Sequence, residues 1–141
     1  MNNLVENALF IAQRVHAGQF RRDKVTPYIN HPIDVANRVK KFGQEYMAVA
    51  YLHDVLEDTN ITARDLLDSG MSADIVEAVK TLTKEKGIYY SGYYFDEYLW
   101  LVKQNEIARR VKIADMISNL ADDPTDKQIA RYAEGLVYLM E

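Results

Sequence analysis

The chain contains no cysteine among its 141 residues. Disulfide bonds, thiolate metal sites and cysteine nucleophiles are therefore excluded. Any metal chemistry in this protein must use histidine, aspartate and glutamate side chains.

Long apolar runs and an excess of basic residues are also missing. No segment approaches the roughly 20 uninterrupted apolar residues of a membrane span, and the N-terminal residues lack the basic and then continuously apolar stretches of a signal peptide. We therefore expect a cytoplasmic protein without a membrane partner. The formal net charge of −4 argues against binding to a nucleic-acid polymer, although a local cationic pocket for a small anion stays open.

The composition, with 48% hydrophobic and 27% charged residues, fits one globular domain over residues 1–141. Apolar spacing and capping signals predict an all-α bundle of about seven to eight helices. We expect them over residues 4–15, 32–42, 44–57, a short stretch after 62, 72–82, 93–102, 106–120 and 124–139. Residues 84–91 are expected to form a loop, although tyrosines in GIYYSGYYF would also suit a strand.

The segment MAVAYLHDVL, residues 47–56, contains only two residues that are neither apolar nor aromatic, His53 and Asp54. A helix that is apolar all round is normally buried, so this segment is predicted to be central. A buried aspartate is costly unless it is paired or binds a metal. The dipeptide alone leaves both explanations open: a core ion pair with an arginine, or a metal site.

Two other segments favour the metal site. Pro32 suits the first position of a helix and places His31 at the helix entrance. On the helix over residues 106–120, an apolar face opposes a polar stripe made of Lys112, Asp115 and Asn119. A solvated helix face would account for Asp115 but not for Asp54.

Two imidazoles and two carboxylates would form a neutralising shell for one divalent cation; the candidates are His31, His53, Asp54 and Asp115. Mixed nitrogen and oxygen ligands suit manganese, iron, cobalt or zinc better than magnesium or calcium. Such a cation polarises phosphoryl oxygens and activates water near neutral pH.

Glu57 and Asp58 follow His53 and Asp54 by four residues, which is one turn if the helix continues. There they would orient or deprotonate the attacking water. The alternative is that they are ordinary surface acids at a helix end.

Cations that could hold phosphate occur in two places. Arg21, Arg22 and Lys24 cluster in the loop before His31, where a charged surface loop is an equal alternative. Lys112 shares the face of Asp115 and is expected to contact a phosphate or an acidic residue. The aromatic residues 88–98 are expected to pack rather than to stack on a base.

Four motifs occur in the order of a known family: GQFR at 18–21, PYINHP at 27–32, LHDVLEDT at 52–59, and VKIAD at 111–115 followed by Asn119. This set resembles the HD-domain metal-dependent phosphohydrolases over about residues 5 to 120. More narrowly, it is similar to the hydrolase domain of Rel/SpoT-type stringent-response enzymes and to small alarmone hydrolases.

The resemblance implies a cofactor, a site and a reaction. The metal, usually manganese, would be held by His31, His53, Asp54 and Asp115, and the catalytic pair would be Glu57 and Asp58. Arg21 would lie against guanine with help from Arg22, and Asn119 would line the nucleotide pocket. The implied reaction removes the 3′-diphosphate of ppGpp or pppGpp, giving pyrophosphate and GDP or GTP.

The chain departs from the family pattern at three points. Met116 stands where an arginine is usual, Ser118 stands where a histidine is usual, and the loop 21–27 is one residue longer. We expect Met116 and Ser118 to lie on the substrate side rather than the metal side. Two alternatives therefore stay open: an HD phosphohydrolase for another nucleotide or phosphate ester, and a non-catalytic regulator. The sequence does not decide whether the chain forms a homo-oligomer.

Overall fold

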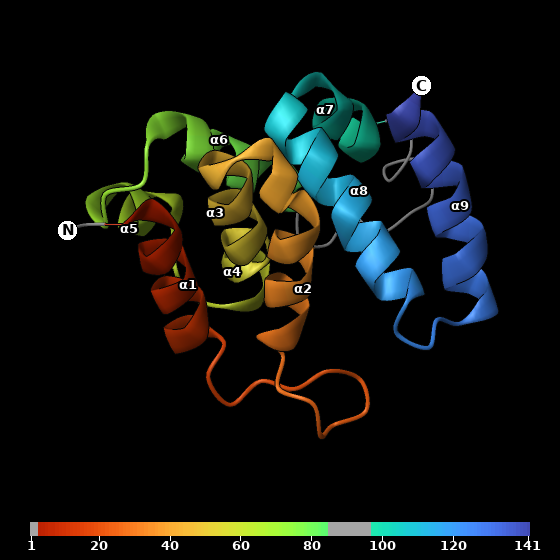
Figure 1. The fold of residues 1–141 in the computed structure, drawn as a ribbon, viewed down its shortest axis with the longest axis horizontal. Coiled ribbons are helices and arrows are strands. Elements are labelled where there is room, and N and C mark those ends of the chain that lie inside the picture. Colours follow the sequence, from red (N-terminus) through yellow and green to blue (C-terminus); the bar gives the residue numbers. More distant parts are fainter. Residues whose placement is uncertain (1–2, 85–96) are drawn as a thin grey trace.

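The computed structural model describes residues 3–84 and 97–141, and Figure 1 shows their helical arrangement. The helices are α1 Leu4–Val15, α2 Asn30–Val39, α3 Gln44–Leu52, α4 Val55–Asp58, α5 Ala63–Asp68, α6 Ala73–Leu82, α7 Leu99–Gln104, α8 Glu106–Leu120 and α9 Asp126–Met140, with a 3-10 turn η1 at Lys40–Phe42. Within these ranges the only strand-like pairing is an isolated bridge between Phe20 and Pro27. The predicted all-α class is confirmed.

Helix α3 lies at the centre of the bundle and packs against α1, α2, α6 and α8. Its residues from Ala48 to Leu52 are buried on every side, as its continuous apolar sequence predicted. In Figure 1 the pair α1 and α2 flanks it, with α8 and then α9 following on the side of α2. Any polar group at the end of α3 therefore starts inside the core.

The predicted single helix over residues 44–57 is wrong, because the chain breaks at His53 and Asp54 between α3 and α4. The carbonyl of Ala50 accepts the backbone N–H of His53 at 3.4 Å and the imidazole Nδ1–H of His53 at 2.6 Å. These bonds replace the regular helical bond, in which the backbone N–H of Asp54 would donate to the same carbonyl. The break gives one helix more than the sequence suggested.

Helix α2 begins two residues earlier than predicted, because the backbone of Asn30 and His31 already bonds back to the carbonyls of Pro27 and Tyr28. His31 therefore lies in the first turn, where it is buried. The helix ends at Val39 and tightens into η1 before Gly43, whose φ of 120° suits glycine.

The remaining predicted elements agree with the structure where it describes them. Capping boxes open α5 at Thr62 and α9 at Thr125, as their sequences indicated. The predicted loop at 84–91, its strand alternative and the start of the predicted 93–102 helix lie almost wholly outside the described residues. Within the described ranges, no helix has the length and apolarity needed to cross a bilayer.

Candidate metal centre

Three buried side chains from separate elements meet beside α3. They are His31 at the start of α2, His53 at the break after α3, and Asp115 in α8, and their ligand atoms lie within 4.8 Å of one another. Asp115 Oδ1 lies 2.7 Å from His31 Nε2 and 3.3 Å from His53 Nε2. The structure thus brings together three of the four metal ligands that the sequence proposed.

The fourth proposed ligand, Asp54, lies at the edge of this group. Its Oδ2 is 3.0 Å from His53 Nε2 and accepts a 2.5 Å hydrogen bond from the hydroxyl of Tyr28. Burial first, and then the negative charge of Asp54, raise the pKa of Tyr28, so its hydroxyl remains protonated and donates. Tyr28 therefore holds Asp54 toward the centre.

The imidazole of His53 is oriented for a cation. Its Nδ1 faces a carbonyl oxygen, which only accepts, so Nδ1 carries a proton and Nε2 is the nitrogen that can bind a cation. Nε2 is buried between two carboxylates, 3.0 Å from Asp54 Oδ2 and 3.3 Å from Asp115 Oδ1, and makes no hydrogen bond of good geometry to either. Buried polar atoms are normally satisfied, so this atom and the nitrogen and oxygen donors around it fit a divalent cation.

The electrostatics of the cluster favour positive charge at its centre. Burial alone would lower the pKa of His53, but the carboxylates of Asp54 and Asp115 outweigh burial and raise it well above its ordinary value. Burial would raise the pKa of Asp115, but Lys112 and the two imidazoles hold it well below the usual range. The carboxylates therefore stay ionised at neutral pH, which is the form that binds a metal.

The polar stripe of α8 faces the interior. The Lys112 ammonium lies 3.0 Å from Asp115 Oδ2, and the Asn119 amide donates to Asp115 Oδ1 at 3.3 Å. Lys112 and Asp115 are both buried, whereas Ile117 on the supposed apolar face is 38% exposed. The alternative of a solvated helix face is wrong for this stripe.

The two acids proposed for catalysis lie in the short helix α4. Despite the break, the Asp58 N–H bonds to the Asp54 carbonyl at 3.0 Å, so these residues remain one turn apart. The Glu57 carboxylate accepts the backbone N–H of Lys84. Burial, and then the negative charges of Asp54 and Glu57, raise the pKa of Asp58 to about 6.

The cluster opens onto a cavity of about 190 Å³. Its walls are formed by Arg21, Tyr28, His31, His53, Asp54, Glu57, Asp58, Leu82, Lys84, Tyr98, Lys112, Asp115, Asn119 and Tyr132. The metal-ligand candidates thus share one space with both acids and with three of the five residues proposed for substrate contact.

Arg21 reaches this cavity from the loop between α1 and α2. Its Nη2 donates to Asn119 Oδ1 at 3.2 Å and to Asp122 Oδ2 at 2.8 Å, and its guanidinium lies 5.7 Å from the centre of the Tyr28 ring. Asn119 therefore links Arg21 to Asp115.

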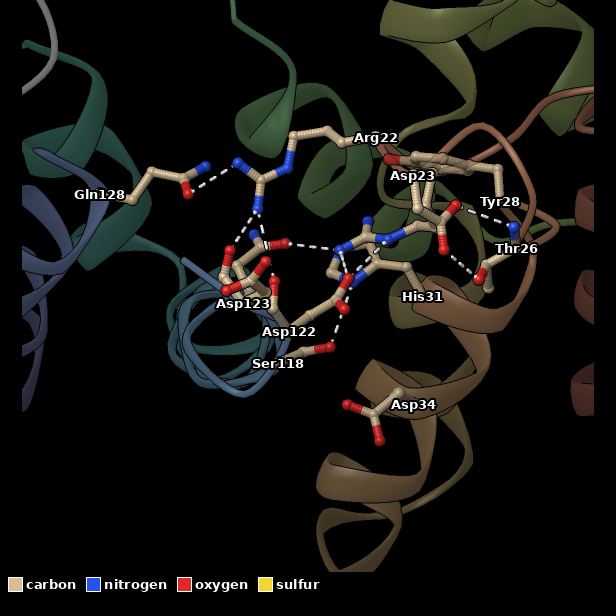
Figure 2. A network of polar contacts seen from close by, with 12 residues as sticks. Arg22, Asp23, Thr26, Tyr28, His31, Asp34, Ser118, Asp122, Asp123 and Gln128 are labelled. Carbon is tan, nitrogen blue, oxygen red and sulfur yellow. Dashed lines mark hydrogen bonds and ion pairs between the residues drawn. The ribbon is translucent and has the colours of Figure 1, made fainter. Parts of the chain in front are cut away.

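Arg22 and Lys24 lie outside the cavity walls. Arg22 donates to Gln128 Oε1 at 3.0 Å and to the carbonyl of Asp123 at 3.2 Å, which fastens the loop to the turn between α8 and α9, as Figure 2 shows. Asp23 accepts the backbone N–H groups of Val25 and Thr26 and closes a turn with Lys24, whose φ is 65°, at its exposed tip. Neither cation is placed to touch a ligand in the cavity.

Sequence reasoning missed several cavity residues. Tyr28 lies inside the motif PYINHP, where nothing in the sequence gives it a role of its own, and Lys84 begins the predicted loop over residues 84–91. The ammonium groups of Lys84 and Lys112 each lie 5.4 Å from the centre of the Tyr98 ring. The charge of Lys112, together with burial, lowers the pKa of Lys84.

Tyr98 is the described member of the aromatic segment that was expected to pack. It is buried and its hydroxyl donates to the Leu82 carbonyl at 2.6 Å, so it packs while also lining the cavity. The other tyrosines of that segment lie outside the described residues. Tyr132, on α9, had no signal in the sequence that set it apart.

The expectation that Met116 and Ser118 lie on the substrate side is wrong. Met116 is fully buried and packs toward Gly135 and Leu99, so close that a Cβ added at Gly135 would lie 2.7 Å from its methyl carbon. Ser118 is also buried, with its hydroxyl 3.1 Å from Nδ1 of His31 (Figure 2). Met116 therefore makes a core contact between α8 and α9. Ser118 contacts the metal-ligand candidate His31 on the side away from the cavity.

Comparisons with known proteins agree with the sequence motifs. A family model described as HD domain matches residues 8–91. The chain is similar to guanosine-3′,5′-bis(diphosphate) 3′-pyrophosphohydrolase MESH1 of Danio rerio, with 33% identity over 124 residues that cover 84% of this chain and 68% of the relative. It is also similar to the guanosine-3′,5′-bis(diphosphate) 3′-pyrophosphohydrolase of Haemophilus influenzae, with 44% identity over 80 residues, but there it spans only 12% of the relative.

A solved structure of a metazoan ortholog of SpoT that hydrolyses ppGpp has a similar fold. The TM-score is 0.78 at 24% identity, and the match covers 100% of this chain and 87% of the other.

Replacing the buried Met116 by the arginine that is usual in the family tests its placement. We expect Met116→Arg to lower the free energy of unfolding by at least about 3 kcal/mol, because a charge would enter an apolar contact without a partner. The volume-conserving Met116→Leu should cost less than about 1.5 kcal/mol. Urea unfolding followed by circular dichroism measures both. An arginine variant as stable as the wild type would show that this side chain reaches the cavity.

Removing the Tyr28 hydroxyl tests how Asp54 is held. We expect Tyr28→Phe to weaken binding of a divalent cation by about 10-fold or more, since outer hydrogen bonds to metal ligands have effects of about 10- to 100-fold. Titration with Mn²⁺ followed by electron paramagnetic resonance gives the affinity. Tyr46→Phe on α3 is the matched control and should bind as the wild type does. Equal affinity for both variants would contradict the role given to Tyr28.

Proposed function

The chain belongs to the HD-domain family, and we propose that it is a metal-dependent hydrolase of guanosine 3′,5′-bis(diphosphate) and its 5′-triphosphate form. The reaction would release the 3′-diphosphate as pyrophosphate and leave GDP or GTP. The observation that carries the proposal is one cavity in which the buried histidine and aspartate cluster faces two acids and three cations. These are the components that hydrolysis of a polyphosphate ester needs.

The cofactor we propose is one Mn²⁺ ion. His31, His53, Asp54 and Asp115 would hold it, and their mixed nitrogen and oxygen donors suit this ion better than Mg²⁺ or Ca²⁺. When bound, a divalent cation supplies Lewis-acid chemistry by polarising a phosphoryl oxygen and making water more acidic.

Asp58 is the better candidate for the general base. Glu57 is held by the Lys84 backbone, whereas Asp58 has a pKa raised to about 6, close to neutral pH. A base with such a pKa is largely ionised at neutral pH and still basic enough to accept a proton from water. Glu57 is left to orient that water from the adjacent wall of the cavity.

The cationic wall suits a substrate with several phosphates. Arg21, Lys84 and Lys112 line the same cavity, and the repulsion that lowers the pKa of Lys84 would be relieved by anionic oxygens between the ammonium groups. We place the guanine against Arg21 and Asn119, as the family resemblance implies. Arg22 contributes by fastening the loop that carries Arg21.

The alternative that the chain hydrolyses another nucleotide or phosphate ester, rather than ppGpp, loses its main argument. It rested on Met116 and Ser118, and neither residue lines the cavity. A non-catalytic regulator would have no need for a carboxylate with a pKa near 6 beside the metal ligands.

An activity assay tests the proposal. Purified protein with and without Mn²⁺ is offered ppGpp, GTP and deoxynucleoside monophosphates, and the products are separated by chromatography. We expect pyrophosphate and GDP from ppGpp only, and only with metal. His53→Ala should lose activity together with metal binding, and Asp58→Asn should lose about 10²- to 10⁴-fold in rate while retaining metal.

Asp68→Asn, which alters an exposed ion pair on α5, is the matched control and should remain active. Orthophosphate released from monophosphates, with ppGpp left intact, would contradict the proposed substrate.

The pH dependence of the rate follows from Asp58. Its pKa is raised to about 6, so a fall in pH through this value protonates the base and removes activity. We expect kcat/KM, measured at saturating Mn²⁺, to decrease about tenfold per pH unit below an apparent pKa at or somewhat below 6, because a bound cation favours the ionised form. The residual rate of Asp58→Asn should lack this acid limb. A wild-type rate that stays constant down to pH 4.5 would exclude Asp58 as the base.

A further inference from the structure

Helix α8 contacts His31 at both of its ring nitrogens. Asp115 Oδ1 lies 2.7 Å from Nε2, and the Ser118 hydroxyl lies 3.1 Å from Nδ1. These two α8 residues are three positions apart, so they share one face of the helix. Asp115 belongs to the proposed metal centre, whereas Ser118 lies behind it and outside the cavity walls.

A serine alone does not decide which nitrogen of His31 carries the proton. A hydroxyl both donates and accepts, so Nδ1 could face it with or without hydrogen. The second histidine has no such ambiguity, because Nδ1 of His53 faces the Ala50 carbonyl, which only accepts. For Nε2 of His31 to offer its lone pair to a cation, Nδ1 must carry the proton.

The cation site decides between the two forms. Nε2 is the ring nitrogen that lies 2.7 Å from Asp115 and within 4.8 Å of the other ligand atoms, so it is the nitrogen that must be without hydrogen when a cation binds. The proton of the neutral ring is then on Nδ1, and the Ser118 hydroxyl oxygen, 3.1 Å away, accepts it.

We propose that Ser118 is the outer partner in a positioning relay: its hydroxyl oxygen accepts the proton of His31 Nδ1, fixes the Nδ1–H form of the ring and thereby presents Nε2 to the divalent cation. Metal-binding histidines commonly have such a partner on the second nitrogen, and its loss costs about 10- to 100-fold in metal affinity. The inference rests on the metal centre proposed above. It also gives Ser118, which replaces the usual histidine, a function on the metal side.

Metal affinity is the first test. We expect Mn²⁺ to bind about tenfold or more weakly to Ser118→Ala than to the wild type, measured by calorimetry on the full chain. Ser69→Ala is the matched control, because it removes an exposed serine hydroxyl at the end of α5, and it should bind as the wild type does. Thermal unfolding shows that each variant is folded at the temperature of the titration.

The second test observes the proton directly. In the Zn²⁺-loaded protein, which is diamagnetic, long-range ¹H–¹⁵N spectra of the three histidines should show a slowly exchanging Nδ1–H on His31. Ser118→Ala should lose this protection while His53 keeps its own, a pattern that a general loss of packing would not give.

The two proposals fail in different ways. Wild-type affinity in Ser118→Ala, together with a protected Nδ1–H on His31, would overturn the relay and leave the metal centre standing. Absence of Mn²⁺ binding by the wild type would overturn the metal centre, and the relay with it.

Discussion

Ionised carboxylates are buried where α2, α3 and α8 meet, and the neighbouring structure serves to compensate their charge. Asp115 is only 6% exposed, and an unpaired charge at such a depth would destabilise the fold by several kcal/mol. The compensation comes from His31, His53 and Lys112, whose positive or donor groups surround it. A divalent cation among the same atoms would do this more completely, which is why we regard the cluster as a metal centre rather than a core ion pair.

The break between α3 and α4 makes this arrangement possible. In a continuous helix, the adjacent residues His53 and Asp54 would point about 100° apart. The hydrogen bonds at the Ala50 carbonyl end α3, and Nε2 of His53 comes within 3.3 Å of both Asp54 and Asp115. The short helix that follows then carries the two acids to the wall of the same cavity. One local departure from helical geometry therefore joins the proposed metal ligands to the proposed catalytic pair.

Much of this site could be predicted from the sequence, because it depends on the burial of one apolar segment and on the order of the motifs along the chain. The apolar run around His53 and Asp54 predicted a central helix, and the motif order predicted which histidine and aspartate would join them. The break was not predictable, because it depends on a side chain competing for a backbone carbonyl that helix propensity alone would leave in a regular bond. The inward direction of the Lys112 and Asp115 stripe was ambiguous, since a polar face lines either solvent or a cavity.

The directions of the side chains in the loop 21–27, and at the positions that depart from the family pattern, are set by tertiary contacts. Lys24 is turned away by the side-chain bonds of Asp23, and Met116 is directed into the core by the space that Gly135 leaves. Neither contact can be read from spacing along the chain. The contact of Ser118 with His31 exists only when α2 and α8 pack together, because the two residues lie on different helices.

The central claim is that His31, His53, Asp54 and Asp115 bind one divalent cation. Diffraction from crystals grown with Mn²⁺, recorded on both sides of the manganese absorption edge, tests it most directly. The account predicts a single strong anomalous peak bonded by these four side chains, with the two imidazoles coordinating through Nε2. A well-ordered site without such a peak, or a peak held by other residues, would contradict it.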